Sequence, residues 1–96
     1  MPAFIIVQVE VTNPEQYKEY QKFSSIAMQT HGVKVLVRGG QQDVLEGQAP
    51  PRTVIMEFPD MAAARAWYES AEYRQAREAR AGAAKMNMYV VDGLSV

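Results

Sequence analysis

Strict alternation of side chains near the start of the chain is the strongest constraint on its fold. Between Phe4 and Val11 every odd-numbered residue is isoleucine or valine, whereas the even-numbered ones become polar at Gln8 and Glu10. Because successive side chains of a β-strand point to opposite faces, this segment predicts a strand that buries one face. Similar runs predict further strands over residues 33–38, 53–58 and 85–92.

Two helical regions separate these predicted strands. Asn13, followed by a proline, is typical of a helix start, and Gly32 is typical of a left-handed helix end, so the first helix is predicted over residues 14–31. Asp60 opens the second region, and Ser70 is expected to cap a new helical segment within it. The resulting order β-α-β-β-α-β is that of the ferredoxin-like plait, an α+β fold.

Length and composition restrict what the chain can do. Its 96 residues provide one hydrophobic core, so a single domain over residues 1–96 is expected. Ten basic and eleven acidic residues give a formal net charge of −1, which argues against nucleic-acid or anionic-membrane binding. No apolar run is long enough to span a bilayer, and the N-terminus lacks the basic start of a signal peptide, so a cytoplasmic protein is expected. With one histidine, no cysteine and no phosphate-binding glycine loop, we expect neither a metal nor a cofactor.

One face of the predicted sheet has no helix to cover it. The uniformly aliphatic sets should face the helices; these are Ile5, Val7 and Val9, then Val33, Val35 and Val37, then Val54, Met56 and Phe58. The opposite face would then present a mixed set of Phe4, Ile6, Gln8, Glu10, Lys34, Leu36, Arg38, Ile55, Glu57 and Tyr89. Because monomers rarely expose so large an apolar patch, we expect a second copy of the chain to cover it, sheet on sheet.

Four charged residues of that face are expected at the interface of the homodimer: Glu10, Lys34, Arg38 and Glu57. Ion pairs between them would fix the register of the two copies. The alternative is a polar site inside the barrel that the two sheets enclose.

His31 and Arg80 are the candidate catalytic residues. His31, the only histidine, is predicted on the apolar stripe of the first helix, where it could act as a general base in a pocket between helices and sheet. The alternative is a helix-end residue that binds the last carbonyl groups. Arg80 lies on an apolar helix face and therefore needs a carboxylate or a bound anion. An internal salt bridge, or a side chain that reaches solvent, is the alternative for Arg80.

Four aromatic residues are candidates for the walls of a ligand pocket. Tyr17 and Tyr20 lie on the inward stripe of the first helix, and Trp67 and Tyr68 lie on that of the second helical region. Aromatic rings with polar tips can line a cavity for a small hydrophobic or aromatic molecule. Packing in the core is the alternative.

Several short strings, taken in order, resemble the family known as domain of unknown function 1330. They are Asn13–Tyr20, His31–Gly32, Arg38–Gly40, Val44–Gly47, Glu57–Pro59, Ala66–Tyr68 and Ser70–Arg74. The resemblance covers nearly the whole chain and implies a dimeric α+β barrel, in which two plaits pack their sheets face to face. Relatives with that architecture include cofactor-independent monooxygenases, haem-degrading enzymes and lactone isomerases, whereas the family itself has no established activity.

Two functions stay open at this point. The first is a cofactor-independent enzyme, similar to a monooxygenase or an isomerase, that acts on a small hydrophobic metabolite with His31 as base and Arg80 as anion partner. Oxygenation without a cofactor is feasible because a substrate carbanion can itself react with O₂. The second is a non-catalytic ligand-binding or accessory module. A cavity of roughly 300 Å³ or more that reaches His31 would favour the enzyme.

Overall fold

A four-stranded antiparallel sheet, in the order β2-β3-β1-β4, forms one layer of the molecule. The computed structural model describes residues 1–94. Its elements, in chain order, are β1 (Ala3–Val11), α1 (Pro14–Thr30), β2 (Lys34–Arg38), β3 (Arg52–Phe58), α2 (Met61–Glu69), α3 (Ala71–Ala79) and β4 (Ala84–Asp92). The predicted ferredoxin-like α+β fold is confirmed, and Ser70 does divide the second helical region into two helices.

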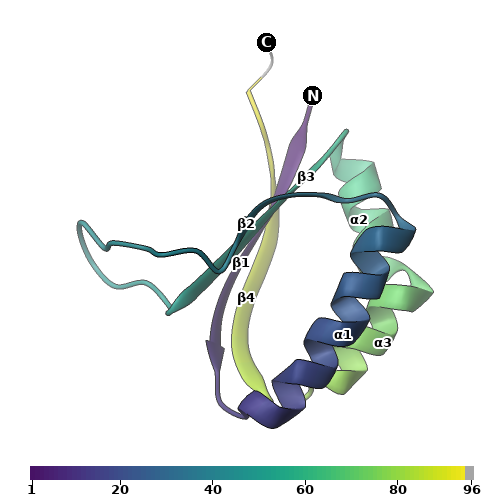
Figure 1. The fold of residues 1–96 in the computed structure, drawn as a ribbon. Coiled ribbons are helices and arrows are strands. Elements are labelled where there is room, and N and C mark those ends of the chain that lie inside the picture. The colour runs from purple at the N-terminus through teal and green to yellow at the C-terminus, as the bar shows by residue number, and fades with distance from the viewer. Residues whose placement is uncertain (95–96) are drawn as a thin grey trace.

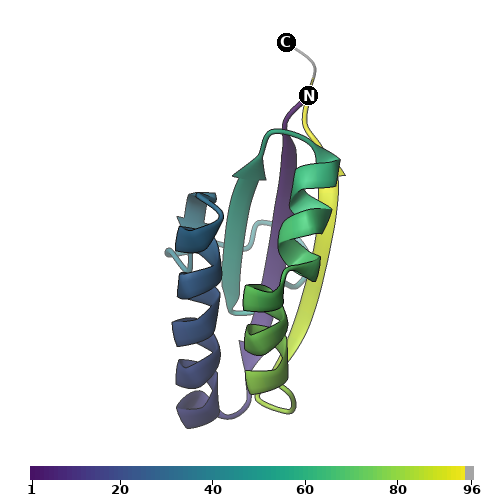
Figure 2. The same ribbon diagram turned by 90° about the vertical axis from the view of Figure 1, so that its right-hand side faces the viewer.

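All three helices cover the same face of the sheet (Figures 1 and 2). Their starts are fixed by the predicted caps, because the side chains of Asn13, Asp60 and Ser70 each accept a hydrogen bond from a backbone N–H three residues further on. Gly32, with φ of 62°, takes the left-handed conformation just past the C-cap of α1, at a position where a side chain would be strained. Local sequence signals therefore set the helix boundaries.

The core lies between the helices and the inner face of the sheet. Ile5, Val7 and Val9 of the central strand are buried, and their partners in register on β3 and β4 point the same way. Val54, Met56 and Phe58 are buried as predicted, and Met86, Met88 and Val90 of β4 pack against the same cluster. The inward sets predicted for β1 and β3 are thus confirmed.

Of the three residues predicted to face the helices around β2, Val33 and Val35 do pack against the core. Val35 pairs with Met56, whereas Val37 pairs with Ile55, so the register shifts by one residue at Leu36. A β-bulge of this kind places an extra residue in one strand and exchanges the faces that lie beyond it. The prediction that Val37 faces the helices is therefore wrong.

The outer face of the sheet carries no helix and is rich in large side chains. Ile6 lies between Ile55 and Tyr89 in register, and Phe4 lies beside Val91. Tyr89 is 51% exposed and Val91 45% exposed, and both are among the larger exposed hydrophobic residues of the chain. We call this surface the open face.

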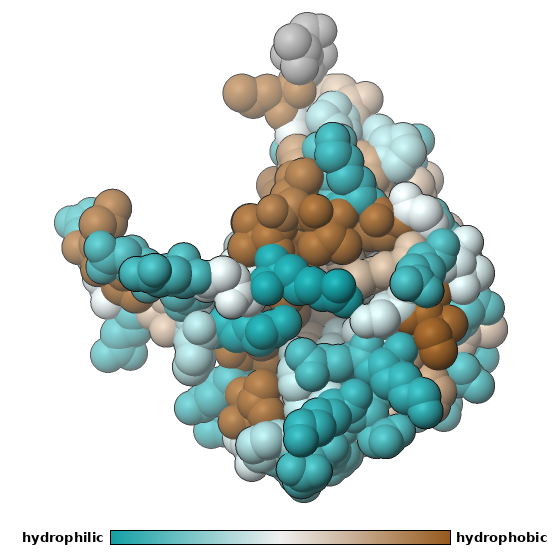
Figure 3. Space-filling model, in the orientation of Figure 1, coloured by the Kyte–Doolittle hydropathy of each residue, from teal (hydrophilic) through white to brown (hydrophobic). Residues whose placement is uncertain are grey.

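A long loop over residues 39–51 projects from the sheet on the side away from the helices (Figure 1). A hydrogen bond of 2.6 Å from Gln42 Nε2 to the Pro50 carbonyl and one of 2.9 Å from Thr53 Oγ1 to Gln42 Oε1 close its base. Its outer part carries Leu45, which is 89% exposed. Figure 3 shows hydrophobic surface on this loop as well as on the body of the molecule.

Candidate functional site

A cavity of about 280 Å³ lies on the inner side of the sheet, between α1 and the strands β1, β2 and β3. Its upper wall comes from one face of α1, and its floor comes from the inward side chains of the sheet. The lining residues are Val7, Tyr17, Tyr20, Gln21, Ser24, Ser25, Met28, Arg38, Arg52, Val54 and Met56. We call it the Tyr–Arg cavity.

Two arginines reach this cavity through the strand register. Arg38 pairs with Val54 and Arg52 pairs with Val9, and both of those partners are buried under the helices. Arg38 Nη2 donates a hydrogen bond of 2.9 Å to Ser25 Oγ on α1 and lies 3.8 Å from the sulfur of Met28. The prediction that Arg38 belongs to the open face is therefore wrong, because the bulge at Leu36 turns Arg38 to the helix side.

Neither guanidinium has an acidic partner among residues 1–94. In the part of the chain that the structure describes, no carboxylate lies within 4.0 Å of Arg38 or Arg52. Arg52 Nε is buried without a hydrogen-bond partner. Arg38 is exposed and Arg52 is half-buried, so both guanidinium groups stay free to bind an acid or an anion.

Gly39 allows Arg52 to take this position. Gly39 has φ of 67°, and a Cβ at that residue would overlap the guanidinium of Arg52. Only glycine combines the left-handed backbone with so close an approach. Gly39 therefore leaves room for the Arg52 side chain, whereas a Cβ at Gly40 would have no atom close to it.

Three tyrosines on α1 and α3 lie at one end of the site, where they contribute aromatic rings and hydroxyl groups. The hydroxyl groups of Tyr20 and Tyr73 are 2.7 Å apart, and the ring centroids of Tyr17 and Tyr20 are 5.1 Å apart. Burial raises the pKa of Tyr17, although the positive charges of Arg52 and Arg80 lower it in part. Burial likewise raises the pKa values of Tyr20 and Tyr73. The three phenols therefore stay protonated at neutral pH and act as hydrogen-bond donors rather than as bases.

Arg80 follows the last residue of α3 and lies behind the tyrosines. Its guanidinium carbon is 5.8 Å from the centroid of the Tyr20 ring, within the range of a cation–π contact, and its Nε is buried without a partner. Arg80 adds positive charge near the cavity without lining it. The internal salt bridge considered for Arg80 does not occur among residues 1–94.

His31 lies at the end of α1, outside the cavities in which a catalytic base was predicted. It is exposed at the C-terminal cap of α1, where its backbone N–H donates to the Ala27 carbonyl at 3.2 Å. Its Nε2 lies 2.6 Å from Glu72 Oε1 at the start of α3. His31 lines neither the Tyr–Arg cavity nor the other two cavities of the molecule, so none of them supports the predicted pocket base. The residue lies at the helix end, as in the alternative interpretation, but its side chain contacts Glu72 and not the last carbonyl groups of α1.

The other predicted pocket residues separate into three environments. Tyr17 and Tyr20 line the Tyr–Arg cavity as expected. Trp67 is 2% exposed and packs against Tyr73, with ring centroids 4.2 Å apart, so it is a core residue. Tyr68 lines a separate cavity against β4. Sequence reasoning missed Arg52, which it left in the loop before β3.

The remaining charged residues lie where the sequence placed them, on the open face. Lys34 is opposite Glu57 in the register of β2 and β3, and Glu10 is opposite Lys85 in that of β1 and β4. Glu10 and Lys85 also line a wide recess of about 650 Å³ between β1, β4 and the base of the projecting loop. Their part in a dimer interface stays a prediction.

Together, the fold and the cavity define a ferredoxin-like α+β protein with a donor-lined interior site. The chain belongs to the family described as Domain of unknown function (DUF1330), which it matches over residues 2–94. No match was found among curated proteins. Within residues 1–94, none of the helices has the length and hydrophobicity needed to cross a membrane.

Three solved structures show the extent of the similarity in fold. A protein of unknown function from Rhodopseudomonas palustris is 22% identical, with a TM-score of 0.75 over 99% of this chain and 84% of that one. A dimeric ferredoxin-like protein of unknown function from Jannaschia sp. CCS1 is 10% identical, with a TM-score of 0.74 over 97% and 100%. SnoaB, a cofactor-independent oxygenase from Streptomyces nogalater, is 7% identical, with a TM-score of 0.68 over 99% and 95%. At these identities the similarity establishes the fold alone.

Proposed function

We propose that this chain binds a small organic anion in the Tyr–Arg cavity and acts on it without a cofactor. The observation that carries the proposal is the polar lining. It consists of two arginines, two tyrosines and the neutral residues Gln21, Ser24 and Ser25, with no carboxylate among the lining residues of the described chain. The hydrophobic remainder of the lining, Val7, Met28, Val54 and Met56, suits a ring or a short aliphatic body. The expected ligand is a carboxylate, an ionised enol or a phenolate on a hydrophobic frame.

The same lining favours ionisation of a weakly acidic ligand. Positive charges close to a developing anion stabilise it, so Arg38 and Arg52 would lower the pKa of a bound enol. Tyr17 and Tyr20 would add neutral donors to the same oxygen, since burial keeps them protonated. The released proton would pass to solvent beside Arg38, which is exposed. The chain's own residues would therefore hold the substrate in its reactive, ionised form.

Oxygenation follows from such an ionised substrate when O₂ is the second reactant. The carbanion gives one electron to O₂, and the two radicals combine to form a C–O bond. Protonation yields a hydroperoxide, and loss of water from it leaves a ketone where the substrate had a CH₂ group. One oxygen atom enters the product and the other leaves as water. The similar fold of SnoaB, a cofactor-independent oxygenase, supports this chemistry for the chain.

A second copy of the chain on the open face completes the proposal. The open face exposes Tyr89 and Val91 beside Ile6 and Phe4, an apolar set that association would remove from water. The similar protein from Jannaschia sp. CCS1, described as dimeric, supports this arrangement. The Tyr–Arg cavity lies on the opposite side of the sheet and would stay accessible in the dimer.

Binding of benzoate tests the anion site, with neutral benzamide as the matched ligand. We expect calorimetric titration to show benzoate binding and no measurable benzamide binding. Arg52→Met should weaken benzoate binding by about 10- to 100-fold, the value of one lost hydrogen bond to a charged group. Arg74→Met, which removes the same charge from an exposed residue outside the cavity, should leave the affinity unchanged.

The pH dependence of benzoate binding separates this site from one built on His31. Between about pH 6 and pH 9 the affinity should stay constant, because arginine remains charged and the raised pKa values of Tyr17 and Tyr20 keep both phenols neutral. A marked loss of affinity near pH 6.5, the ordinary pKa of histidine, would contradict the assignment. Equal binding of benzoate and benzamide would contradict it too.

Non-catalytic ligand binding is the second candidate function, because no side-chain base lines the cavity in the described residues. Oxygen uptake with anthrone, a ketone whose CH₂ group is activated by two aromatic rings, distinguishes the two functions. An oxygenase should consume O₂ above the rate in buffer, at least about tenfold faster than Arg52→Met and at the same rate as Arg74→Met. Benzoate binding without such uptake would favour the binding module.

A further inference from the structure

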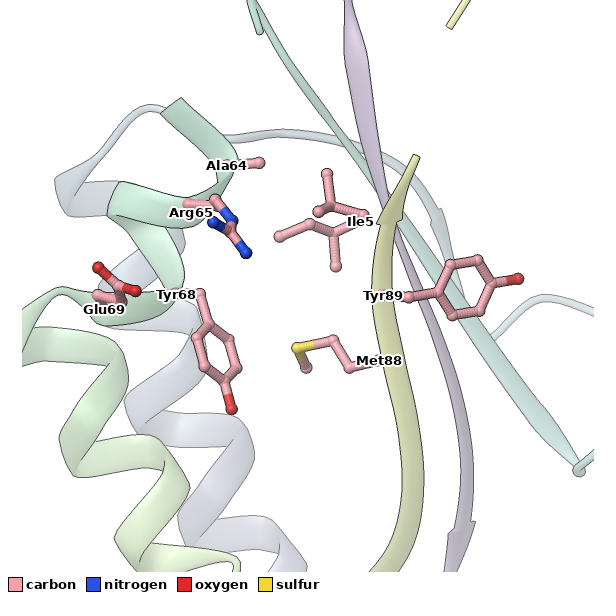
Figure 4. Close-up of a pocket in the computed structure, with 8 residues that line it drawn as sticks. Ile5, Ala64, Arg65, Tyr68, Glu69, Met88 and Tyr89 are labelled. Carbon is pink, nitrogen blue, oxygen red and sulfur yellow. The ribbon is translucent and has the colours of Figure 1, made fainter. Parts of the chain in front are cut away.

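A second cavity of about 260 Å³ lies between α2 and the edge strand β4. Figure 4 shows its walls, with α2 on one side and β4 on the other. The lining residues are Ile5, Ala64, Arg65, Tyr68, Glu69, Met88, Tyr89 and Val90. We call it the α2–β4 cavity, and it shares no lining residue with the Tyr–Arg cavity.

The interior of the α2–β4 cavity is hydrophobic. The Tyr68 ring projects from α2 toward Met88 on β4, with Ile5 on the neighbouring strand β1 (Figure 4). Tyr89, in contrast, points away from the cavity on the other side of β4. The charged groups of α2 are one of each sign, Arg65 and Glu69. This lining lacks the excess of positive charge found around Arg38 and Arg52, so it favours a neutral ligand.

Packing holds the walls of the α2–β4 cavity in place. The guanidinium carbon of Arg77 lies 4.5 Å from the centroid of the Tyr68 ring, and Tyr73 lies 5.6 Å from it, centroid to centroid. Ala64 is fully buried on the inward face of α2, and its short side chain leaves space beside Ile5 and Met88. A methionine side chain adapts to differently shaped ligands, so Met88 gives this preformed space some tolerance.

We propose that the α2–β4 cavity is a separate binding site for a small, neutral, mainly aromatic molecule of one or two rings. The volume of about 260 Å³ is slightly below the roughly 300 Å³ at which ligand pockets usually begin, which restricts the occupant to that size. The Tyr68 ring offers a stacking surface, and its hydroxyl offers one polar contact. The proposal does not depend on the anion site, because the two cavities differ in lining and in charge.

An NMR titration with indole, observed at the methyl groups of the methionines, tests this site. Met88 lines the α2–β4 cavity, whereas Met28 and Met56 line the Tyr–Arg cavity, so ¹³C-methyl methionine labelling gives each cavity its own reporter. Titration with indole should shift the Met88 resonance, which Met88→Leu identifies, and leave those of Met28 and Met56 in place. Benzoate should produce the reverse pattern.

Variants of α2 make the test specific. Ala64→Leu fills the cavity and should weaken indole binding at least about tenfold. Ala66→Leu, an equal change on the exposed face of the same helix, should leave it unchanged. Tyr68→Leu, which removes the stacking surface without enlarging a core side chain, should also weaken binding. The proposal is overturned if Met88 does not respond up to the solubility limit of indole, if all three methyl groups shift together, or if neither Ala64→Leu nor Tyr68→Leu changes the affinity.

Discussion

Replacing Ile6 with glutamate is expected to dissociate the proposed dimer into monomers. Ile6 lies at the centre of the open face, between Ile55 and Tyr89 in register. A carboxylate there would be buried by the second copy without a partner, and an unpaired buried charge costs about 3–5 kcal/mol. That cost corresponds to a dissociation constant raised by about two to four orders of magnitude. Size-exclusion chromatography with light scattering, at several protein concentrations, measures the change.

Ile26→Glu is the matched control for this experiment. Ile26 is 46% exposed on α1, away from the open face, so the same substitution there should leave the dimer intact. A wild-type protein that is monomeric at tens of micromolar would contradict the proposed interface. Dissociation by Ile26→Glu but not by Ile6→Glu would place the interface on the helices instead.

The sequence predicted the fold because its strongest signals are local. Alternation in β1 specifies one buried face, and the same pattern in β3 specifies which residues lie under the helices. The capping side chains of Asn13, Asp60 and Ser70 mark helix starts by a mechanism that involves only the next three residues. Signals of this range can be read without knowing the tertiary structure.

The arginine site escaped prediction because its geometry depends on a one-residue shift in β2. Val35, Leu36 and Val37 are all aliphatic, so hydrophobicity does not distinguish the regular register from the bulged one. The shift turns Arg38 from the open face to the cavity. Arg52 was missed for a related reason, since β3 begins one residue earlier than predicted and thereby brings Arg52 into the inward alternation with Val54.

His31 illustrates where helical periodicity ceases to apply. The stripe that contains Tyr20 and Ser24 would include His31 if α1 continued, but the helix ends at Thr30. The histidine then adopts the backbone of a C-cap, and its side chain turns to Glu72 rather than toward the sheet. A residue beside a helix-ending glycine therefore cannot be assigned to a face by spacing alone.

Replacing Trp67 with alanine is expected to cause the largest loss of stability among single core substitutions considered for this chain. The Trp67 side chain is fully buried between Tyr73 and Phe58, with ring centroids 4.2 Å and 5.8 Å away. Removing a buried indole from such contacts costs about 3–5 kcal/mol, through lost burial and the cavity that remains. Urea denaturation at a fixed protomer concentration would show it as a lower midpoint with a similar slope.

Trp67→Phe separates the contribution of ring contact from that of the indole N–H. Trp67 Nε1 is buried without a hydrogen-bond partner, and such a group is unfavourable by about 1–3 kcal/mol. Phenylalanine removes this N–H and retains one ring against Tyr73, so its loss of stability should be less than half that of Trp67→Ala. Equal losses for the two variants would indicate that the indole N–H has a partner in solution, and a loss below about 1.5 kcal/mol for Trp67→Ala would contradict the assignment of Trp67 to the core.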